Sequence, residues 1–303
     1  MKRAVSVSLG SSSRDKKVIV DFQGEKVSIE RIGTDGDVEK AKRLFRELDS
    51  QVDAFGIGGV DLYLRVDDRK YPLRAAFQLI EGVKETPVLD GRGLKHTLER
   101  RVFELAGPAL EEILGEIPRF QQAFIPVTVD RIGLAEAVAE RSEHVVFGDL
   151  MIGLGVPIPI HGLRNYKRVT RMLFPILSYF PLSMLFYGSG GSEKKAKYHK
   201  YWRESDLLAG DFMFMRLHLG EDLAGKMVIT NTTTDENIQL LRERGVRLVV
   251  TTTPRYEGRS FGTNMMEAAL TALAGEGQRL SYEQLNKLID ELGLVPHVEV
   301  LNP

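Results

Sequence analysis

Two threonine triplets, each directly after an apolar run, are the most distinctive polar feature of the sequence. The first, residues 232–234, follows "GKMVITN", which ends in Asn231. The second, residues 251–253, lies in "VRLVVTTTP" just before its final proline. Hydroxyls and free amides at a strand end can hold phosphate, ribose or carboxylate groups. Asp211, after the run "LLAG", adds a carboxylate. The pattern predicts a cofactor site, and the alternative is that threonine serves only as strand residue and helix cap. The residues assigned to this cofactor site are Asp211, Asn231, Thr232, Thr233, Thr251, Thr252 and Thr253.

The loop after the second triplet, "RYEGRSFGTN", concentrates further polar groups. Arg259 is suited to pairing with an anionic ligand, and Gly262 allows the backbone to approach it closely. Thr263 and Asn264 would present a hydroxyl and a carboxamide from the first turn of the next helix. We assign Arg259, Gly262 and Thr263 to cofactor binding and Asn264 to substrate binding. A capped helix with solvated arginines is the alternative.

A lysine and two aspartates near predicted strand ends are candidates for acid–base chemistry. Asp61 follows the glycine-ended run "GIGG", and "LDGRGLKH" brings Asp90 and Lys95 close together. A lysine beside an aspartate can act as a general acid or base when its pKa is lowered or its charge is anchored. An ion pair at a helix start is the alternative.

Alternating apolar and amphipathic segments must position these groups. The runs 225–231 and 246–254 are predicted strands, and 232–245 is the helix between them, so both triplets would lie at the carboxyl ends of adjacent parallel strands. In open α/β sheets ligands bind at that edge. The segment 206–217 is a further predicted strand, and 93–107, 260–274 and 281–292 are predicted helices.

The repeated strand–helix order predicts an α/β protein with two α/β domains and mostly parallel sheets. The boundary is placed at 1–118 for an N-terminal substrate domain and 119–303 for a Rossmann-like C-terminal domain. No low-complexity linker marks it.

Composition narrows the function classes. The 303 residues are 43% hydrophobic and 27% charged, with a net charge of -1, which indicates a globular protein with no nucleic-acid partner. The absence of cysteine excludes disulfides and thiolate sites, and the six histidines show no ligand spacing, so no metal is predicted. The N-terminal "MKRAVSVSLG" has no signal-peptide pattern, and we expect a cytoplasmic protein.

One strongly apolar segment, 172–187, is shorter than a membrane-spanning helix, and Pro175 and Pro181 interrupt it. We expect no membrane span. The pattern predicts a buried helix followed by a buried strand, and a membrane-surface or partner-docking element is the alternative.

Five segments together resemble a bacterial family labelled quinate 5-dehydrogenase, or shikimate-dehydrogenase-like. They are "VSVSLGSS", "IERIGTDGD", "DGRGLKHTLERR", "AGKMVITNTTT" and "VVTTTPRYEGRSFGTN", and the similarity extends over nearly the whole chain. The resemblance implies that Ser6 and Ser8 bind the substrate and that Lys95, with Asp61 or Asp90, transfers protons. It also implies NAD or NADP as cofactor, although the G-x-G-x-x-G fingerprint is absent.

The first functional hypothesis is therefore an NAD(P)-dependent oxidoreductase acting on a quinate- or shikimate-like polyhydroxylated cyclic acid. The alternative is a non-catalytic two-domain α/β protein that binds a small anionic or nucleotide ligand in a cleft between its domains. A third hypothesis is an enzyme of another type, for example a transferase that uses a phosphorylated ligand. Whether the chain is an enzyme therefore stays open. In each case the expected partner is a small anionic molecule, and homodimer formation is left open.

Overall fold

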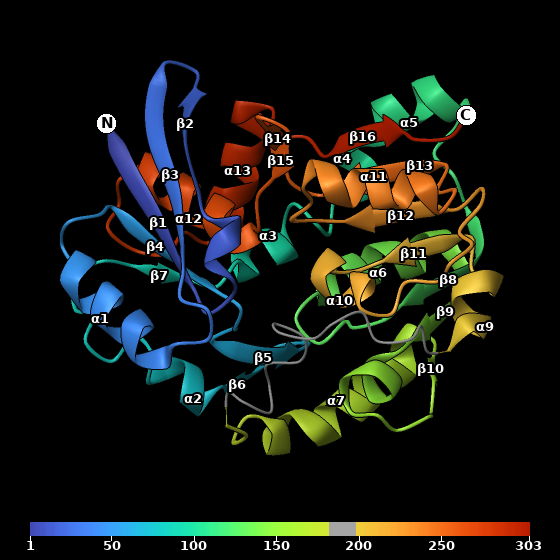
Figure 1. The fold of residues 1–303 in the computed structure, drawn as a ribbon, viewed down its shortest axis with the longest axis horizontal. Coiled ribbons are helices and arrows are strands. Elements are labelled where there is room, and N and C mark those ends of the chain that lie inside the picture. Colours follow the sequence, from blue (N-terminus) through green and yellow to red (C-terminus); the bar gives the residue numbers. More distant parts are fainter. Residues whose placement is uncertain (182–197) are drawn as a thin grey trace. The chain divides into compact units, whose positions relative to one another are not determined.

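The structure, a computed structural model, describes residues 1–181 and 198–303. They form two compact units, which are described separately (Figure 1). The first unit contains Met1–Thr97, 172–181 and Gly262–Gly293, and the second contains Leu98–Arg171, 198–261 and Leu294–Pro303. The first unit thus takes in a late segment that the predicted division into 1–118 and 119–303 places in the other domain. That segment contains a helix whose apolar side packs on the first unit's sheet.

The first unit is built on a five-stranded sheet in the order β2-β3-β1-β4-β7. All its pairs are parallel except the antiparallel hairpin of β2 and β3. The strands of this unit are β1 (Lys2–Ser8), β2 (Lys16–Phe22), β3 (Glu25–Gly33), β4 (Ala54–Gly58) and β7 (Val88–Leu89), with a separate pair, β5 (Tyr63–Val66) and β6 (Arg69–Pro72). Its helices are η1 (Ser12–Arg14), α1 (Val38–Leu48), α2 (Arg74–Phe77), α3 (Arg92–His96), α12 (Thr263–Ala274) and α13 (Tyr282–Leu292).

Helices cover both faces of this sheet. Side chains along β4 point alternately to the two faces, and all of them are buried, so both faces need a cover. Phe55 packs edge-on against Phe45 of α1, with ring centroids 5.2 Å apart. The next residue, Gly56, faces α12, where an added Cβ would lie 2.9 Å from the Asn264 carbonyl oxygen. The sequence signals set the helix starts: the Asp37 side chain accepts a hydrogen bond from the backbone of Lys40 and begins α1.

The second unit has a seven-stranded sheet in the order β10-β9-β8-β11-β12-β13-β16. The five strands from β9 to β13 in this order are parallel, and the two edge strands are antiparallel. The strands of this unit are β8 (Phe120–Ile125), β9 (Ser142–Phe147), β10 (Ile160–His161), β11 (Leu207–Ala209), β12 (Met227–Thr230), β13 (Leu248–Thr251), β14 (Arg255–Tyr256), β15 (Arg259–Ser260) and β16 (His297–Val300). Its helices are α4 (Val102–Leu105), α5 (Gly107–Leu114), α6 (Ile132–Arg141), η2 (Asp149–Gly153), α9 (His199–Glu204), α10 (Phe212–Arg216) and α11 (Asp235–Glu243), and α7 (Leu163–Leu177) begins here.

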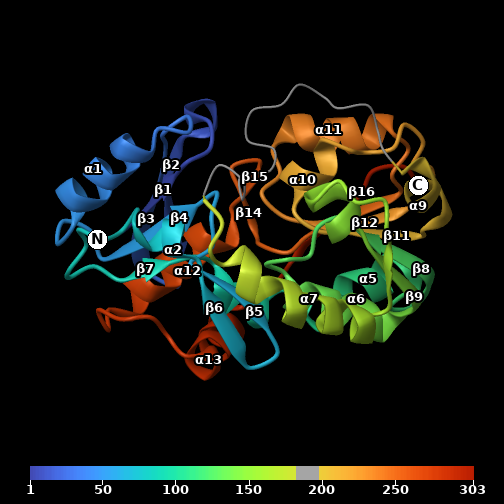
Figure 2. The same cartoon turned by 90° about the horizontal axis from the view of Figure 1, so that it is seen from below.

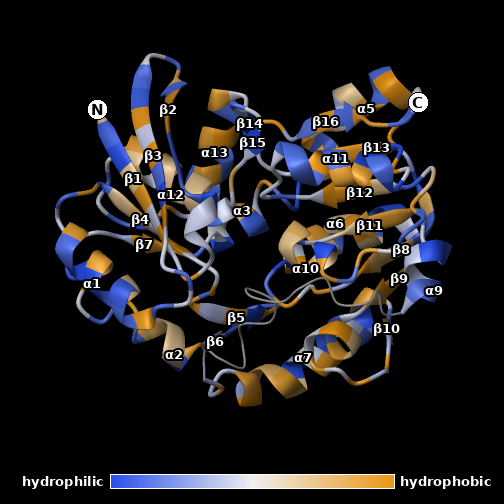
Figure 3. Cartoon of the chain, in the orientation of Figure 1, coloured by the Kyte–Doolittle hydropathy of each residue, from blue (hydrophilic) through white to orange (hydrophobic). Residues whose placement is uncertain are grey.

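The hydrophobic core of this unit has two layers, one on each face of the sheet. Ala123 and Ile125 of β8 belong to the layer that contains α4, α5 and α6. Phe124, between them, faces the other way and meets Trp202 of α9 at a ring-centroid distance of 5.1 Å. Figure 2 shows α10 and α11 on one side of the strands and α5, α6 and α7 on the other, and the strands are largely orange in Figure 3. The predicted fold class, two α/β domains with mostly parallel sheets and a Rossmann-like C-terminal domain, is confirmed.

Two predicted elements differ in the structure. The predicted strand 206–217 ends at Ala209, because Asp211 accepts a hydrogen bond from the backbone of Met213 and begins α10. The predicted helix 93–107 is broken into α3 and α4. The break lies where the chain passes from the first unit to the second, between Thr97 and Leu98.

The apolar segment 172–187 lies partly outside the described residues. Its first part belongs to the end of α7, where Met172 and Ile176 are 74% and 59% exposed, so this part is not the buried helix that the sequence predicts. Within the part of the chain that the structure describes, no helix is long and apolar enough to cross a membrane.

Candidate functional site

The strand order of the second unit reverses between β8 and β11. From β8 the chain crosses through α6 to β9, and the later strands β11, β12 and β13 lie on the other side of β8. The loop after β8 therefore leads to a helix on one face, and the loop after β11 leads to a helix on the opposite face. In doubly wound sheets ligands bind where two such loops diverge, at the carboxyl ends of the strands.

Arg131 and Asp211 meet at this point. Arg131 is the last residue before α6, and Asp211 is the last residue before α10. The Arg131 Nη2 atom lies 2.8 Å from Asp211 Oδ2, while Asp211 Oδ1 accepts the hydrogen bond that begins α10. The two loops that flank the reversal thus each contribute one charged side chain to a shared ion pair.

Three further polar side chains complete a buried cluster around Arg131. Glu99, whose side chain is fully buried, accepts a hydrogen bond from Arg131 Nη1 and another from Thr252 Oγ1 at 3.2 Å. Asn231, directly after β12, forms hydrogen bonds with both Arg131 and Asp211 when its carboxamide oxygen faces Arg131. In that orientation the oxygen accepts from both terminal nitrogens of Arg131 at 2.6 Å, and the amide donates to Asp211 at 3.2 Å. We call Glu99, Arg131, Asp211, Asn231 and Thr252 the Arg131 cluster.

The two threonine triplets lie at the carboxyl ends of adjacent parallel strands. The first follows β12, and the second begins at Thr251, the last residue of β13, which is in register with Thr230 of β12. Most of their hydroxyls bond to the protein itself. Thr233 Oγ1 lies 2.9 Å from Ser260 Oγ, and Thr253 Oγ1 donates to the Phe261 carbonyl at 2.6 Å. The side chain of Thr234 caps α11. The triplets therefore tie β12 and β13 to the following loop, and of the assigned threonines only Thr252 enters the Arg131 cluster.

The remaining predicted cofactor residues divide between the units. Arg259 is a buried residue of β15 in the second unit. Gly262 is the residue before α12 and Thr263 is the first residue of that helix, both in the first unit. Thr232 has a left-handed backbone, with φ 54°, at the turn between β12 and α11. The predicted binding of NAD or NADP stays a prediction.

The first unit brings the predicted acid–base residues together. Lys95 Nζ lies 2.6 Å from Asp61 Oδ1, and the lysine side chain is 6% exposed. Asp90 accepts hydrogen bonds from the backbone of Leu62 at 3.1 Å and from Arg279 Nη2 at 3.0 Å. Burial raises the pKa of Asp90, but the charges of Arg279, Arg92 and Lys95 together outweigh this effect and hold the pKa below its usual value. Both aspartates are therefore engaged by cations.

The serines assigned to substrate binding have separate partners. Asn264 Nδ2 donates to Ser6 Oγ at 2.8 Å, so these two predicted substrate residues do meet. Ser8 Oγ instead accepts from Arg31 Nη2 at 3.0 Å and from the backbone of Gly10 at 3.1 Å.

Sequence reasoning missed Glu99, Arg131, Arg279 and Glu267. A signal existed for Arg131, because it begins the helical run "RIGLAEAVAERS" directly after the strand-like run "QAFIPVTVD". None existed for Glu99, which lies inside the predicted helix 93–107 and reaches the cluster only because that helix is broken.

Glu267 of α12 is a buried carboxyl of the first unit with a strongly raised pKa. It is 1% exposed, and its Oε2 accepts a hydrogen bond from the backbone of Gly93 at 2.8 Å. Burial raises the pKa of Glu267 to about 7, against the attraction of Arg279, 3.8 Å away. The native state therefore holds this proton more tightly than the unfolded chain, in which the group has its ordinary value of 4.5.

This pKa predicts a specific pH dependence of stability. Between pH 4.5 and about 7 the native state binds more protons, so the contribution of Glu267 to the free energy of unfolding falls as pH rises. The fall amounts to about 3 kcal/mol. Relative to the wild type, Glu267→Gln should gain stability by about that amount between pH 4.5 and 8, measured by urea unfolding at several pH values. A stability difference that does not change with pH would contradict the raised pKa.

The described residues contain no group of three or more histidine, cysteine, aspartate or glutamate side chains that could hold a metal ion. The fold and its polar clusters define a two-unit α/β protein.

Residues 93–301 match the family "Domain of unknown function (DUF8754)" and residues 3–90 match "Domain of unknown function (DUF8753)". The first match spans more than half of the chain, so the chain belongs to the DUF8754 family. No curated protein matches the sequence.

The solved structures to which the chain is distantly similar include two sugar-binding proteins and an aspartate transcarbamoylase. A carbohydrate transporter solute binding protein from Agrobacterium radiobacter, in complex with D-arabinose, has 10% identity and a TM-score of 0.34, with 92% of this chain and 90% of that chain covered. A glucose-galactose binding protein from Geobacillus stearothermophilus has 12% identity and a TM-score of 0.34, with 99% and 97% covered. Aspartate transcarbamoylase from Trypanosoma cruzi has 12% identity and a TM-score of 0.36, with 92% and 83% covered. Similarity at this level identifies no ligand and no reaction.

The resemblance to the quinate 5-dehydrogenase family is therefore wrong. The families that match are the two domains of unknown function, and nothing among the matches supports a dehydrogenase. The first functional hypothesis, an NAD(P)-dependent oxidoreductase for a quinate-like acid, is wrong with it. A physical feature agrees with this correction: the loop after β8, "PVTVDR", contains no glycine, whereas a dinucleotide loop needs glycines where the backbone approaches the pyrophosphate.

Proposed function

We propose that this chain is a non-catalytic binding protein whose second unit binds a small polyhydroxylated molecule at the Arg131 cluster. The observation that carries the proposal is the meeting of Arg131 and Asp211 at the strand-order reversal, 2.8 Å apart. The pair lies between two loops that diverge to opposite faces, at the edge where such sheets bind ligands, and this position supports the proposal.

The donors and acceptors of the cluster match hydroxyl groups. Glu99 and Asp211 accept hydrogen bonds, Arg131 donates them, and the carboxamide of Asn231 does both. A hydroxyl both donates and accepts hydrogen bonds. Neighbouring hydroxyls on one ring can therefore donate to the carboxylates of the cluster and accept from its guanidinium. The side chains of Asp211 and Asp130 are 18% and 14% exposed, whereas that of Glu99 is fully buried, so a ligand would approach from the aspartate side.

The sequence led us to expect an anionic ligand, but such a ligand fits the Arg131 cluster less well than a neutral one. Two carboxylates already surround the one guanidinium of the cluster. The nearby start of α11 is an unfavourable anion site too, because Asp235 and Glu236 occupy its first turn and already use the positive end of the helix dipole.

Asp211→Asn tests this proposal. Calorimetric titration of the wild type with neutral monosaccharides and their sugar acids should detect binding of a neutral sugar. Asp211→Asn should weaken it about 10- to 100-fold, since a hydrogen bond to a charged group contributes about 1.5–3 kcal/mol. The matched control is Asp222→Asn, at an exposed turn of the same unit, which should leave the affinity unchanged. Tighter binding of the sugar acids would favour the anionic alternative, and equal affinities of Asp211→Asn and the wild type would contradict the proposal.

A further inference from the structure

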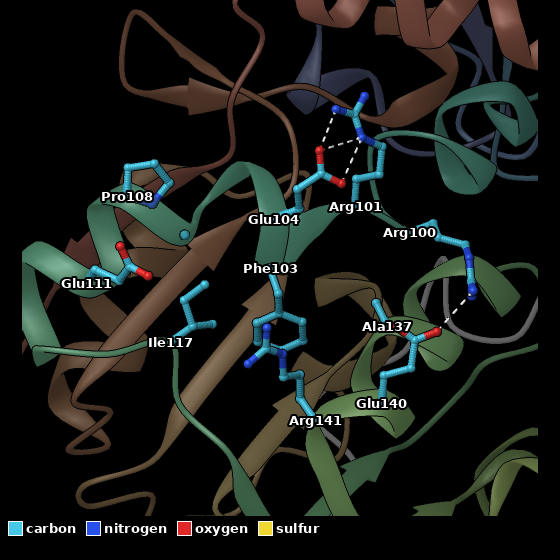
Figure 4. Close-up of a pocket in the computed structure, with 11 residues that line it drawn as sticks. Arg100, Arg101, Phe103, Glu104, Pro108, Glu111, Ile117, Ala137, Glu140 and Arg141 are labelled. Atoms are coloured by element: carbon cyan, nitrogen blue, oxygen red, sulfur yellow. Dashed lines mark hydrogen bonds and ion pairs between the residues drawn. The ribbon is translucent and has the colours of Figure 1, made fainter.

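A pocket of about 450 Å³ lies in the second unit, lined by residues of α4, α5 and α6 and of the segments beside them (Figure 4). Its volume is within the range of small-molecule sites. It contains no member of the Arg131 cluster.

The pocket combines an apolar wall with one cation that has no carboxylate partner. Phe103 and Ala137 are 5% and 4% exposed, and Ile117 packs against the same core. Gly107 keeps space open beside Ile117, because an added Cβ would lie 3.0 Å from its Cδ1 atom. Arg141, the half-buried last residue of α6, makes no ion pair with any residue in the described ranges 1–181 and 198–303.

The other two arginines of the pocket are already engaged. Arg100 pairs with Glu136 at 2.5 Å and with Glu140 at 3.0 Å, and Arg101 pairs with Glu104 at 2.7 Å. Figure 4 shows the pairs with Glu140 and Glu104 at the sides of the pocket. Of the three arginines that line the pocket, Arg141 is therefore the one whose guanidinium is available to a ligand.

We propose that this pocket binds a small monocarboxylate with an apolar body, whose carboxylate pairs with Arg141. The planar guanidinium matches a carboxylate with two parallel hydrogen bonds. The side chains of Phe103, Ile117 and Ala137 would remove the hydrocarbon part of the ligand from water. A phosphate dianion is the poorer match, because three glutamates line the same pocket and repel a second negative charge.

The test is an NMR titration of the isotope-labelled protein with phenylacetate and with phenylacetamide, which has the same shape but no charge. Phenylacetate should shift the backbone amide signals of Phe103, Gly107 and Ala137, and phenylacetamide should bind at least 10-fold more weakly. Arg141→Gln should weaken phenylacetate binding at least 10-fold, whereas Arg164→Gln, an exposed arginine of α7, should not change it.

A second variant addresses the apolar wall. Ile117→Trp fills the pocket at a partly exposed position and should abolish the shifts while the dispersion of the other amide signals is kept. Equal binding of the acid and the amide, unchanged binding by Arg141→Gln, or shifts confined to residues outside the pocket would each overturn the proposal.

Discussion

Replacement of Arg131 by methionine should lower the free energy of unfolding by about 3–5 kcal/mol, the cost of leaving a buried charge without its partner. Glu99 has no exposure to solvent, and Arg131 pairs with both Glu99 and Asp211. Thermal unfolding should show the melting temperature reduced by roughly 6–20 °C.

Two further variants separate this effect from a general loss of an arginine. Arg100→Met removes a cation that also pairs with two glutamates, but its side chain is 39% exposed, so the loss should stay below about 1 kcal/mol. The double variant Arg131→Met with Glu99→Gln removes the buried charge and should recover most of the lost stability. If Arg131→Met were as stable as Arg100→Met, the buried ion pair would not be the source of stability at this edge.

Gly91→Ala should destabilise the first unit by about 2–6 kcal/mol, from a strained backbone and a steric clash together. Gly91 has φ 83°, which an L-residue adopts at a cost, and an added Cβ would lie 2.4 Å from Thr263 Oγ1 and 2.6 Å from the Asn264 backbone nitrogen. Because two of these contacts are to the start of α12, that helix would have to move away from the sheet on which it packs.

Gly115→Ala is the matched control for this variant. Gly115 has φ 82°, nearly the same backbone conformation, but an added Cβ there meets nothing within 4 Å. It should therefore show the cost of the backbone alone, about 1–3 kcal/mol. Urea unfolding of both variants measures the difference, which isolates the close approach of Gly91 to α12. Equal losses in the two variants would show that the contact with Thr263 contributes nothing.

Local signals in the sequence determined the strands β12 and β13 of the second unit and the helix between them. The runs ending at Thr230 and Thr251 are strands because they are short, apolar and β-branched, and the helix between them begins at Thr234 with a capping box to Asn237. A parallel pair with a helical crossover follows from that order, so the shared edge of the two triplets could be predicted.

Local signals failed where a contact distant in sequence decides the conformation. The segment 93–107 has the apolar spacing of one helix, but the chain leaves one unit and enters the other after Thr97, and the helix ends there. Glu99 is thereby free to enter a cluster with Arg131 and Thr252, residues 32 and 153 positions away. No spacing rule connects positions so far apart.

By itself the sequence determined the α/β class, the two-unit construction and the polar edge after β12 and β13, because each follows from periodicity and strand order. It also named Lys95 with Asp61 or Asp90 as acid–base residues and Ser6 and Asn264 as substrate residues, and in the first unit Lys95 meets Asp61 and Asn264 meets Ser6. Only the tertiary structure decided which polar groups gather around Arg131 and which groups of the protein the triplet hydroxyls bond to. The physical reason is that partners of buried polar groups are selected by packing, since a buried donor or acceptor must find whichever complementary group the fold brings within reach.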